Sequence, residues 1–405
     1  MKVMPLVVGA LSLFLGAGVV LVFNKPGAKK PAPPTVERRI APDEIDTRSA
    51  RVAVPMSGDR RPEETIKRTA SPDGVDPRIA KMNSDGVDAL NAGRFMKAVE
   101  LFEQCYVAVP KEPVFTGNLA EALARLASSE FDADSESRRR SAIEHMTRAV
   151  ELAPSRPDLA QRLAQMKSLA ESEEGMWTDE SEHFQLSYDG ERSEVLGGAS
   201  VLTNALESAY QQYGELFGFY PVETGRPKIR VVLYRRDGFH EATGMGHWAG
   251  GVYDGTMRVP VDDLKREKSA LTRVLRHELA HAFVHAGGGT AVPGWLNEGL
   301  AQRLEFDSMA HAQTTLERTR RDLHGVELIP LSSLGGTLGE LKDEAKISLA
   351  YREALAFVGW IERQYGDLVP FQLVAAQKSI GVARAFEKAT GVKLDVAWTD
   401  FADGL

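Results

Sequence analysis

The chain of 405 residues contains a single cysteine, Cys105. One cysteine excludes an intramolecular disulfide framework and any zinc site built from several cysteine thiolates. It also excludes a lipoprotein-type modification at the N-terminus, because no cysteine lies near that end. Cys105 falls on the small-residue side of a predicted helix, so we expect it to pack in a core and not to react.

The sequence also lacks an excess of basic residues. Its 57 Asp and Glu residues outnumber its 49 Lys and Arg residues, which gives a formal net charge of -8. A general nucleic-acid binder needs positive charge to neutralise phosphates, so no nucleic-acid partner is expected. With 43% hydrophobic residues, the chain has enough apolar material for two or three packed domains.

A long uncharged run is present at the N-terminus, at residues 3–23. As a helix it spans about 30 Å, the thickness of a bilayer core, so segment 1–24 is predicted to be a transmembrane anchor. A cleaved signal peptide is the alternative, although its apolar run is usually shorter. Lys25, Lys29 and Lys30 favour a cytoplasmic soluble part, whereas export is the commoner outcome for such a leader. We expect a membrane-anchored, bacterial-envelope-like protein whose soluble part lies outside the cytoplasm.

Residues 25–79 are rich in proline and charge, and no helical or strand period persists in them. Such a segment buries too little apolar surface to offset the entropy of ordering, so a flexible, disordered linker is predicted.

Residues 80–175 are predicted to be helical and contain an internal repeat. Ala98, Phe102 and Pro110 recur 44 residues later as Ala142, Met146 and Pro154. Small residues let paired helices approach, the large apolar one fills the groove between them, and proline ends the unit. The region resembles tetratricopeptide repeats, whose usual period is about 34 residues. The repeat is therefore longer than the usual period, and we place the extra residues in a polar insertion between helices, ASSEFDADSESRRR. We also expect a capping helix at 158–172. Such repeats imply a protein partner.

From residue 176 the pattern mixes strands and helices, so the fold class is α+β. Strands are predicted at 183–188 and 229–234, and a hairpin at 250–260 around Asp254-Gly255. Helices are predicted at 195–218, 269–286, 295–306, 309–323 and 347–365.

The stretch VLRHELAHAF contains two histidines four residues apart, His277 and His281. On a helix these positions lie one turn apart on the same face, so both imidazoles can reach one metal ion. Glu278 stands where metalloproteases place their general base. An HExxH pattern arises by chance in such a chain on the order of one time in a hundred, so further ligands are needed.

A third ligand is predicted in PGWLNEGLAQ, seventeen residues past His281, where Glu298 opens an apolar-spaced helix. A carboxylate from an adjacent helix completes the His₂Glu set of a hydrolytic zinc centre. Gly299 and Ala301 are expected to let this helix lie close to the metal helix, and Trp295 to anchor it.

The succession GxYDG, HELAH, PGWLNEGLAQ and AYREALAFVGWIERQYG resembles the peptidase MA-like metallopeptidases, a gluzincin group related to thermolysin. The resemblance covers about residues 180–400 and implies a zincin-like domain at 176–405. It implies that His277, His281 and Glu298 bind Zn²⁺ and that Glu278 is the catalytic base. Tyr351 takes the place of a tyrosine that hydrogen-bonds the developing oxyanion.

One position departs from thermolysin, which has an aspartate one turn after the ligand glutamate to orient a ligand histidine. Here that position is Gln302, which is expected to accept the same N–H hydrogen bond. His285 lies one turn further along the metal helix but is rotated away, so it is not expected to be a fourth ligand. His247 and Trp248 either line the cleft or pack in a loop.

These features predict a membrane-anchored zinc metallopeptidase that hydrolyses peptide bonds in protein or peptide substrates, with the repeats as a docking module. The alternative is a non-catalytic envelope scaffold in which the repeats bind partners and the C-terminal domain is a folded binding module.

Overall fold

The computed structural model describes residues 74–131, 136–190, 198–222, 228–243, 250–306, 308–341 and 343–405. The predicted anchor at 1–24, nearly all of the predicted linker, and His247 and Trp248 lie outside these ranges. Among the helices that are described, none is both long enough and apolar enough to cross a bilayer.

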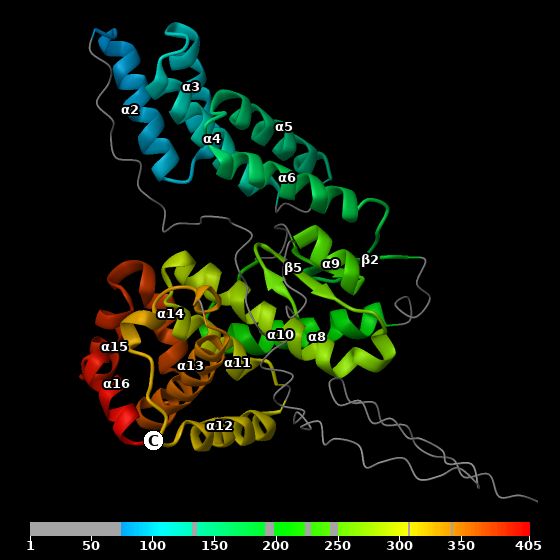
Figure 1. The fold of residues 1–405 in the computed structure, drawn as a ribbon, viewed down its shortest axis with the longest axis vertical. Coiled ribbons are helices and arrows are strands. Elements are labelled where there is room, and N and C mark those ends of the chain that lie inside the picture. The colour runs from blue at the N-terminus through cyan, green and yellow to red at the C-terminus, as the bar shows by residue number, and fades with distance from the viewer. Residues whose placement is uncertain are drawn as a thin grey trace, which may run out of the picture.

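The described part of the chain opens with a run of antiparallel helices, here called the helical unit (Figure 1). Its elements are α2 (Pro77–Asn91), α3 (Phe95–Ala108), α4 (Pro113–Phe131), α5 (Glu136–Leu152) and α6 (Pro157–Ser172). Asp76 caps α2 by accepting from the Arg78 amide at 2.8 Å, and Pro77 is pre-set for the first turn. Phe102 and Cys105 are fully buried, so the prediction that Cys105 packs in a core is confirmed.

The predicted polar insertion is mostly helical, so that prediction was wrong. Helix α4 continues to Phe131 and α5 already begins at Glu136, so both ends of the stretch belong to helices. Phe131 is buried, and the guanidinium of Arg139 lies 5.0 Å from the centre of its ring. The end of α4 and the start of α5 thus extend into the stretch, and the burial of Phe131 accompanies this extension. Arg139 lies in the extended part of α5.

A five-stranded mixed sheet follows, in the order β1-β2-β3-β5-β4. The strands are β1 (Trp177–Glu180), β2 (Phe184–Tyr188), β3 (Ile229–Tyr234), β4 (Val252–Tyr253) and β5 (Thr256–Pro260). The inner strands β2, β3 and β5 are parallel, and the edge strands β1 and β4 pair antiparallel to their neighbours. The hairpin expected around Asp254-Gly255 is β4–β5, and Gly255 has φ +107° at its turn.

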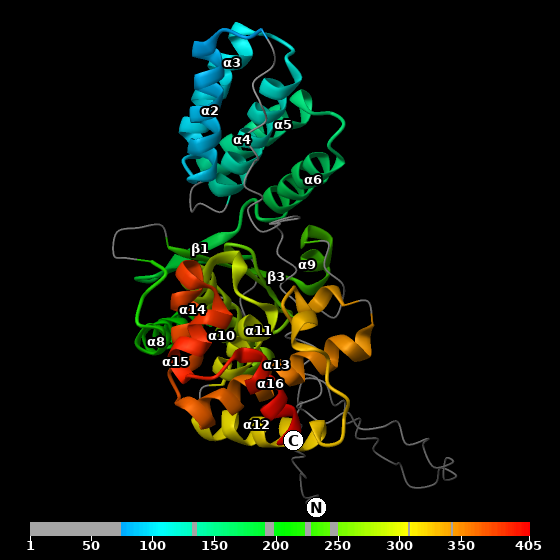
Figure 2. The ribbon, with the colours of Figure 1, turned by 90° about the vertical axis from the view of Figure 1, so that its left-hand side faces the viewer.

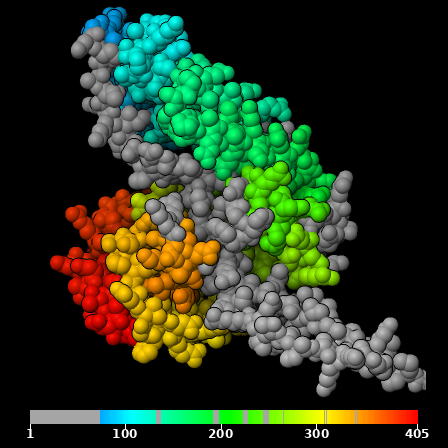
Figure 3. Space-filling model, in the orientation of Figure 1, coloured from blue at the N-terminus to red at the C-terminus, as the bar shows by residue number. Residues whose placement is uncertain are grey.

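Both faces of this sheet are covered, because the strand residues alternate between two cores. On β3, Val231 and Leu233 face a core shared with α8 (Ala199–Phe217) and α10 (Leu264–Gly288). Val232 and Tyr234 face the opposite way, into the core of the helical unit and of α9 (Arg236–Thr243). Figure 2 shows the helical unit resting on the sheet near α6 and α9, where Gln165 donates to the Thr243 carbonyl at 3.5 Å. Figure 3 shows the surface of the helical unit above that of the rest of the described chain.

Helices form the rest of the chain: α11 (Gly294–Leu304), α12 (Met309–Leu323), α13 (Glu344–Tyr365), α14 (Val369–Ile380), α15 (Val382–Thr390) and α16 (Leu394–Asp403). The α+β fold class is confirmed, and each helix and strand predicted beyond residue 176 is present. Strand β3 and helix α12 have the predicted ends, and the ends of the others are shifted. Strand β1 and helices α9, α14, α15 and α16 were not predicted. Helix α11 packs between α10 and α13, which places it beside the HELAH segment.

Candidate metal centre

Helix α10 carries His277, Glu278 and His281 in its second half. Leu275, Leu279 and Phe283 occupy its inward side and are at most 1% exposed, so the apolar spacing buries this part of the helix under the sheet. The two histidines are 1% and 4% exposed and Glu278 is 3% exposed. Polar groups buried to this degree require partners or a bound cation.

Helix α11 brings Glu298 to the same place. Its first turn is anchored by Trp295, as the sequence led us to expect. Trp295 is 1% exposed, and its ring centroid lies 5.0 Å from that of Phe357. Gly299 packs against a different helix from the predicted one. A Cβ at Gly299 would lie 2.5 Å from the Ala354 carbonyl oxygen, so the glycine allows close packing against α13 and not against α10.

The three predicted ligands lie together as one buried group. The Oε2 atom of Glu298 is 3.6 Å from His277 Nε2 and 3.7 Å from His281 Nε2. The ligand atoms of the group all lie within 4.8 Å of one another. A tetrahedral zinc ion with bonds of about 2.1 Å holds its ligand atoms roughly 3.4 Å apart. The group therefore has the dimensions of a zinc site with small adjustments.

Unsatisfied atoms at the centre of the group support the same interpretation. His281 Nε2, Glu298 Oε2 and Glu278 Oε2 are buried and accept or donate no hydrogen bond within the part of the chain that the structure describes. One imidazole nitrogen and two carboxylate oxygens are thus without a partner at the centre of the group, and zinc commonly takes nitrogen and oxygen donors of this kind. The residues present thus fit a metal ion.

The electrostatics of the group are those of a cation site. Burial opposes a charge on His277, but the carboxylates of Glu298 and Glu305 outweigh it and raise the pKa to about 10. Burial raises the pKa of Glu278 to about 8; His277 opposes the shift, and the carboxylates of Glu298 and Asp254 add to it. The carboxylates that favour a proton on His277 also favour a divalent cation, so protons and metal compete here.

Each histidine is oriented by an acceptor on its outer nitrogen. His281 Nδ1 lies 2.9 Å from Asn297 Oδ1, and His277 Nδ1 lies 3.3 Å from Glu305 Oε2. Such partners fix the ring and the tautomer, which turns Nε2 toward the centre of the group. Asn297 neighbours Glu298 in the sequence, and Glu305 follows it by two helical turns. Spacing on α11 was the only available signal for either residue.

Gln302 does not orient a ligand histidine, so that prediction was wrong. Its side-chain amide donates to the backbone carbonyls of Tyr351, at 2.9 Å, and of Glu298, at 3.2 Å. The Gln302 amide is directed toward α13 instead of α10. These hydrogen bonds connect α11 to α13, and Tyr351 is buried where the two helices meet.

The β4–β5 hairpin closes one side of the group. A Cβ at Gly251, the residue before β4, would lie 2.9 Å from Glu278 Oε1 and 2.8 Å from Val274 Cγ1. Only glycine fits there without displacing the carboxylate. His285, one turn beyond His281, is outside the ligand group and lies beside the ring of Tyr253, with centroids 6.4 Å apart.

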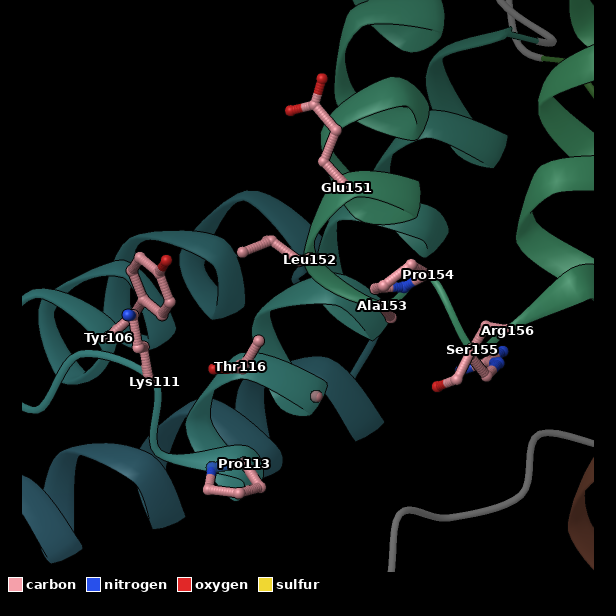
Figure 4. Close-up of a pocket in the computed structure, with 11 residues that line it drawn as sticks. Tyr106, Lys111, Pro113, Thr116, Glu151, Leu152, Ala153, Pro154, Ser155 and Arg156 are labelled. Atoms are coloured by element: carbon pink, nitrogen blue, oxygen red, sulfur yellow. The ribbon is translucent and has the colours of Figure 1, made fainter.

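A second candidate site lies on the helical unit. A cavity of about 500 Å³ opens where α3 and α5 end and α4 and α6 begin (Figure 4). Tyr106, Lys111, Thr116, Leu152 and Arg156 are among the residues that line it. The mixture of apolar, hydroxyl and basic groups can contact a polypeptide.

No protein-family model matches the chain, and a search of the curated proteins returns no match.

Proposed function

We propose that this protein is a zinc-dependent metallopeptidase with a zincin-like domain at 176–405. One observation carries the proposal: three ligand atoms from α10 and α11 converge in a buried group, with the carboxylate of Glu278 beside them. A structural zinc site needs no ionisable carboxyl at that position. A hydrolytic site does, because a proton must be moved during the reaction.

His277, His281 and Glu298 would hold the ion. Zinc bound by such a set supplies Lewis acidity toward a carbonyl group and toward water. Glu278 is proposed to take a proton from the attacking water and to return it to the leaving amine. Glu305 and Asn297 hold the two rings while this happens.

Tyr351 and strand β4 complete the proposed site. Tyr351 is buried on α13, next to the ligand helix, and is proposed to donate its hydroxyl to the developing oxyanion. Strand β4 pairs with β5 at the edge of the sheet. An extended peptide can add to such an edge as a further strand, which makes a peptide or protein the proposed substrate.

The proposal includes two further parts. The tetratricopeptide-like helical unit is proposed to dock a protein partner, with the cavity around Tyr106 and Lys111 as the contact. The uncharged run at 3–23 is proposed to anchor the protein in a membrane, with the soluble part outside the cytoplasm. A scaffold without catalysis is the second candidate, and the same cavity favours it.

The experiment compares Glu278→Gln with wild type in the full-length protein. Glu267→Gln, a change of the same kind in the first turn of α10, is the matched control. We expect both variants to bind zinc as wild type does. Hydrolysis of a peptide library should fall by roughly 10²- to 10⁴-fold for Glu278→Gln alone, because a general base is removed. A zinc-loaded wild type no more active than Glu278→Gln would leave the scaffold as the function.

A further inference from the structure

A buried charge cluster joins the helical unit to the sheet. Glu173, the residue after α6, is 2% exposed at its side chain and binds three guanidinium groups. Its Oε2 lies 2.8 Å from Arg139 Nη1 and 2.9 Å from Arg230 Nη2. Its Oε1 accepts from Arg258 Nε at 3.4 Å and from the Tyr234 hydroxyl. Arg139 belongs to the helical unit, and the other three partners belong to β3 and β5.

Arg258 continues the cluster toward the candidate active site. It is fully buried on β5, and its Nη1 donates to Asp254 Oδ1 in the turn of the β4–β5 hairpin. The same oxygen accepts from the Thr256 amide at 3.1 Å, which closes the turn. A guanidinium without solvent depends on its carboxylates, so Arg258 requires both Glu173 and Asp254.

The hairpin then meets the catalytic carboxylate. Gly251 lies against Glu278 and Val274 with no space for a side chain, and Asp254 lies close enough to Glu278 to influence its charge. Strand β4, between these two residues, is the proposed substrate edge. Contacts thus run without a break from the end of α6, through Arg258 and Asp254, to the hairpin beside the metal group.

We propose that Glu173 is a positioning residue for the candidate active site. Through Arg258 and Asp254 it fixes the β4–β5 hairpin, and the hairpin fixes the space in which the carboxylate of Glu278 and the substrate strand lie. The helical unit is therefore linked, through Glu173 and Arg258, to the hairpin that lies beside the candidate active site. The effect of Glu173 on the position of the hairpin does not depend on the proposed function. Its effect on catalysis rests on the proposed function.

The charges of the cluster support a fixed geometry. Burial alone would raise the pKa of Glu173, but the guanidinium groups of Arg258, Arg139 and Arg230 outweigh it and lower the pKa to about 2. The carboxylate is therefore ionised under all ordinary conditions. It cannot leave the three guanidinium groups without exposing unpaired buried charge, so it holds β3, β5 and α5 in one arrangement.

The test uses the full-length protein with Glu173→Gln and with Glu173→Asp, which keeps the charge on a side chain one methylene shorter. The matched control is Glu121→Gln. Glu121 also binds two arginines, Arg125 at 2.8 Å and Arg156 at 3.2 Å, but both lie in the helical unit. Hydrogen exchange followed by mass spectrometry reports on residues 250–260, and bound zinc is measured on the same samples.

We expect Glu173→Gln to speed exchange in 250–260 by about tenfold, since one charge-assisted contact of the hairpin is lost. Glu173→Asp should lie between Glu173→Gln and wild type, Glu121→Gln should match wild type, and zinc content should stay constant. If Glu173→Gln does not fold, the comparison of Glu173→Asp with Glu121→Gln decides. Folded Glu173 variants whose hairpin exchanges like wild type, or like Glu121→Gln, would overturn the inference.

Peptide hydrolysis separates this inference from the proposed function. For Glu173→Gln we expect kcat/KM per bound zinc to fall roughly ten- to a hundredfold, with a raised KM, because the substrate edge is displaced. A merely destabilised protein would show a smaller active fraction and an unchanged KM, which would contradict the inference. If wild type hydrolyses no peptide, the proposed function fails and hydrogen exchange alone decides on Glu173.

Discussion

The two buried glutamates Glu173 and Glu298 are similar in burial and opposite in surroundings. Glu173 meets three guanidinium groups and a tyrosine hydroxyl, so its oxygens are saturated by donors from the chain itself. Glu298 meets two imidazoles whose outer nitrogens are already used by Asn297 and Glu305, and its Oε2 has no donor among the described residues.

The difference shows how a buried carboxylate can be structural in one place and a candidate metal ligand in another. A cluster that contains its own cations is complete, and it holds elements together. A cluster in which acceptors converge attracts a cation, either a proton on His277 or a metal ion from outside. The first kind is expected to respond to acid and to loss of charge, and the second to metal and to loss of ligands.

The largest effect is expected from removing a ligand. His281→Ala should lower zinc affinity by more than about a hundredfold, since loss of an outer partner alone lowers it about 10- to 100-fold. The matched control is His285→Ala, one helical turn further along α10 and outside the ligand group. Zinc titration with a competing chelator measures both variants.

The control variant should bind zinc as wild type does and lose zinc with the same chelator dependence. Equal losses of affinity in both variants would mean that the two imidazoles are not distinguished by the site. The contrast between a ligand cluster and a self-neutralised cluster would then be lost.

A smaller effect is expected from acid at Glu173. Its pKa falls from 4.5 to about 2 on folding, so it stabilises the folded state fully above about pH 4.5. That stability, about 3 kcal/mol from the size of the shift, is lost as the pH falls from about 4.5 to about 2. Denaturant unfolding across this range measures it.

Glu173→Gln should remove this part of the pH dependence, because the amide does not titrate. Glu121→Gln, the matched control within the helical unit, should keep the wild-type dependence. A stability that declines in acid as steeply in Glu173→Gln as in wild type would show that the arginine cluster does not hold the carboxylate ionised.

The smallest effects are expected from the outer partners of the metal group. Glu305→Gln should weaken zinc binding by about tenfold, because the amide is a weaker acceptor for the ring of His277. Gln302→Met should leave zinc affinity unchanged and lower the free energy of unfolding by about 1 kcal/mol, because a buried hydrogen bond to the Tyr351 carbonyl is lost. The reverse pattern would restore Gln302 as the residue that orients a ligand.

Predictions from the sequence were accurate where the signal is local. Helix α12 runs over the predicted residues because the Ser308 cap, the apolar spacing and the end at Leu323 are all encoded within a few residues. Strand β1, by contrast, has four exposed residues, WTDE, and no alternation that could mark it as a strand. Its strand conformation comes from pairing with β2, which a reading of the segment alone does not include.

The partners of the buried charged side chains could not be predicted from the sequence either. Arg230 and Arg258 stand in predicted strands as isolated charges, and Glu173 lies just after a polar helix. Arg230 and Arg258 are 57 and 85 residues away from Glu173 in the sequence, and nothing in any one segment indicates that they pair with it. Gln302 was predicted to orient a histidine because it takes the position of the orienting aspartate of thermolysin, one turn after Glu298. The side chain that contacts His277 is Glu305, one further turn away.

The sequence by itself determined the ligand positions on each helix, since a spacing of four residues places His277 and His281 on one face whatever surrounds the helix. It also determined the α+β class through its two hydrophobic periods. Only the tertiary structure decided that Glu298 meets those histidines, that Glu305 and Asn297 orient them, and that the helical unit reaches the hairpin through Glu173. These outcomes depend on how separate elements pack, and packing is decided by the whole set of buried surfaces at once.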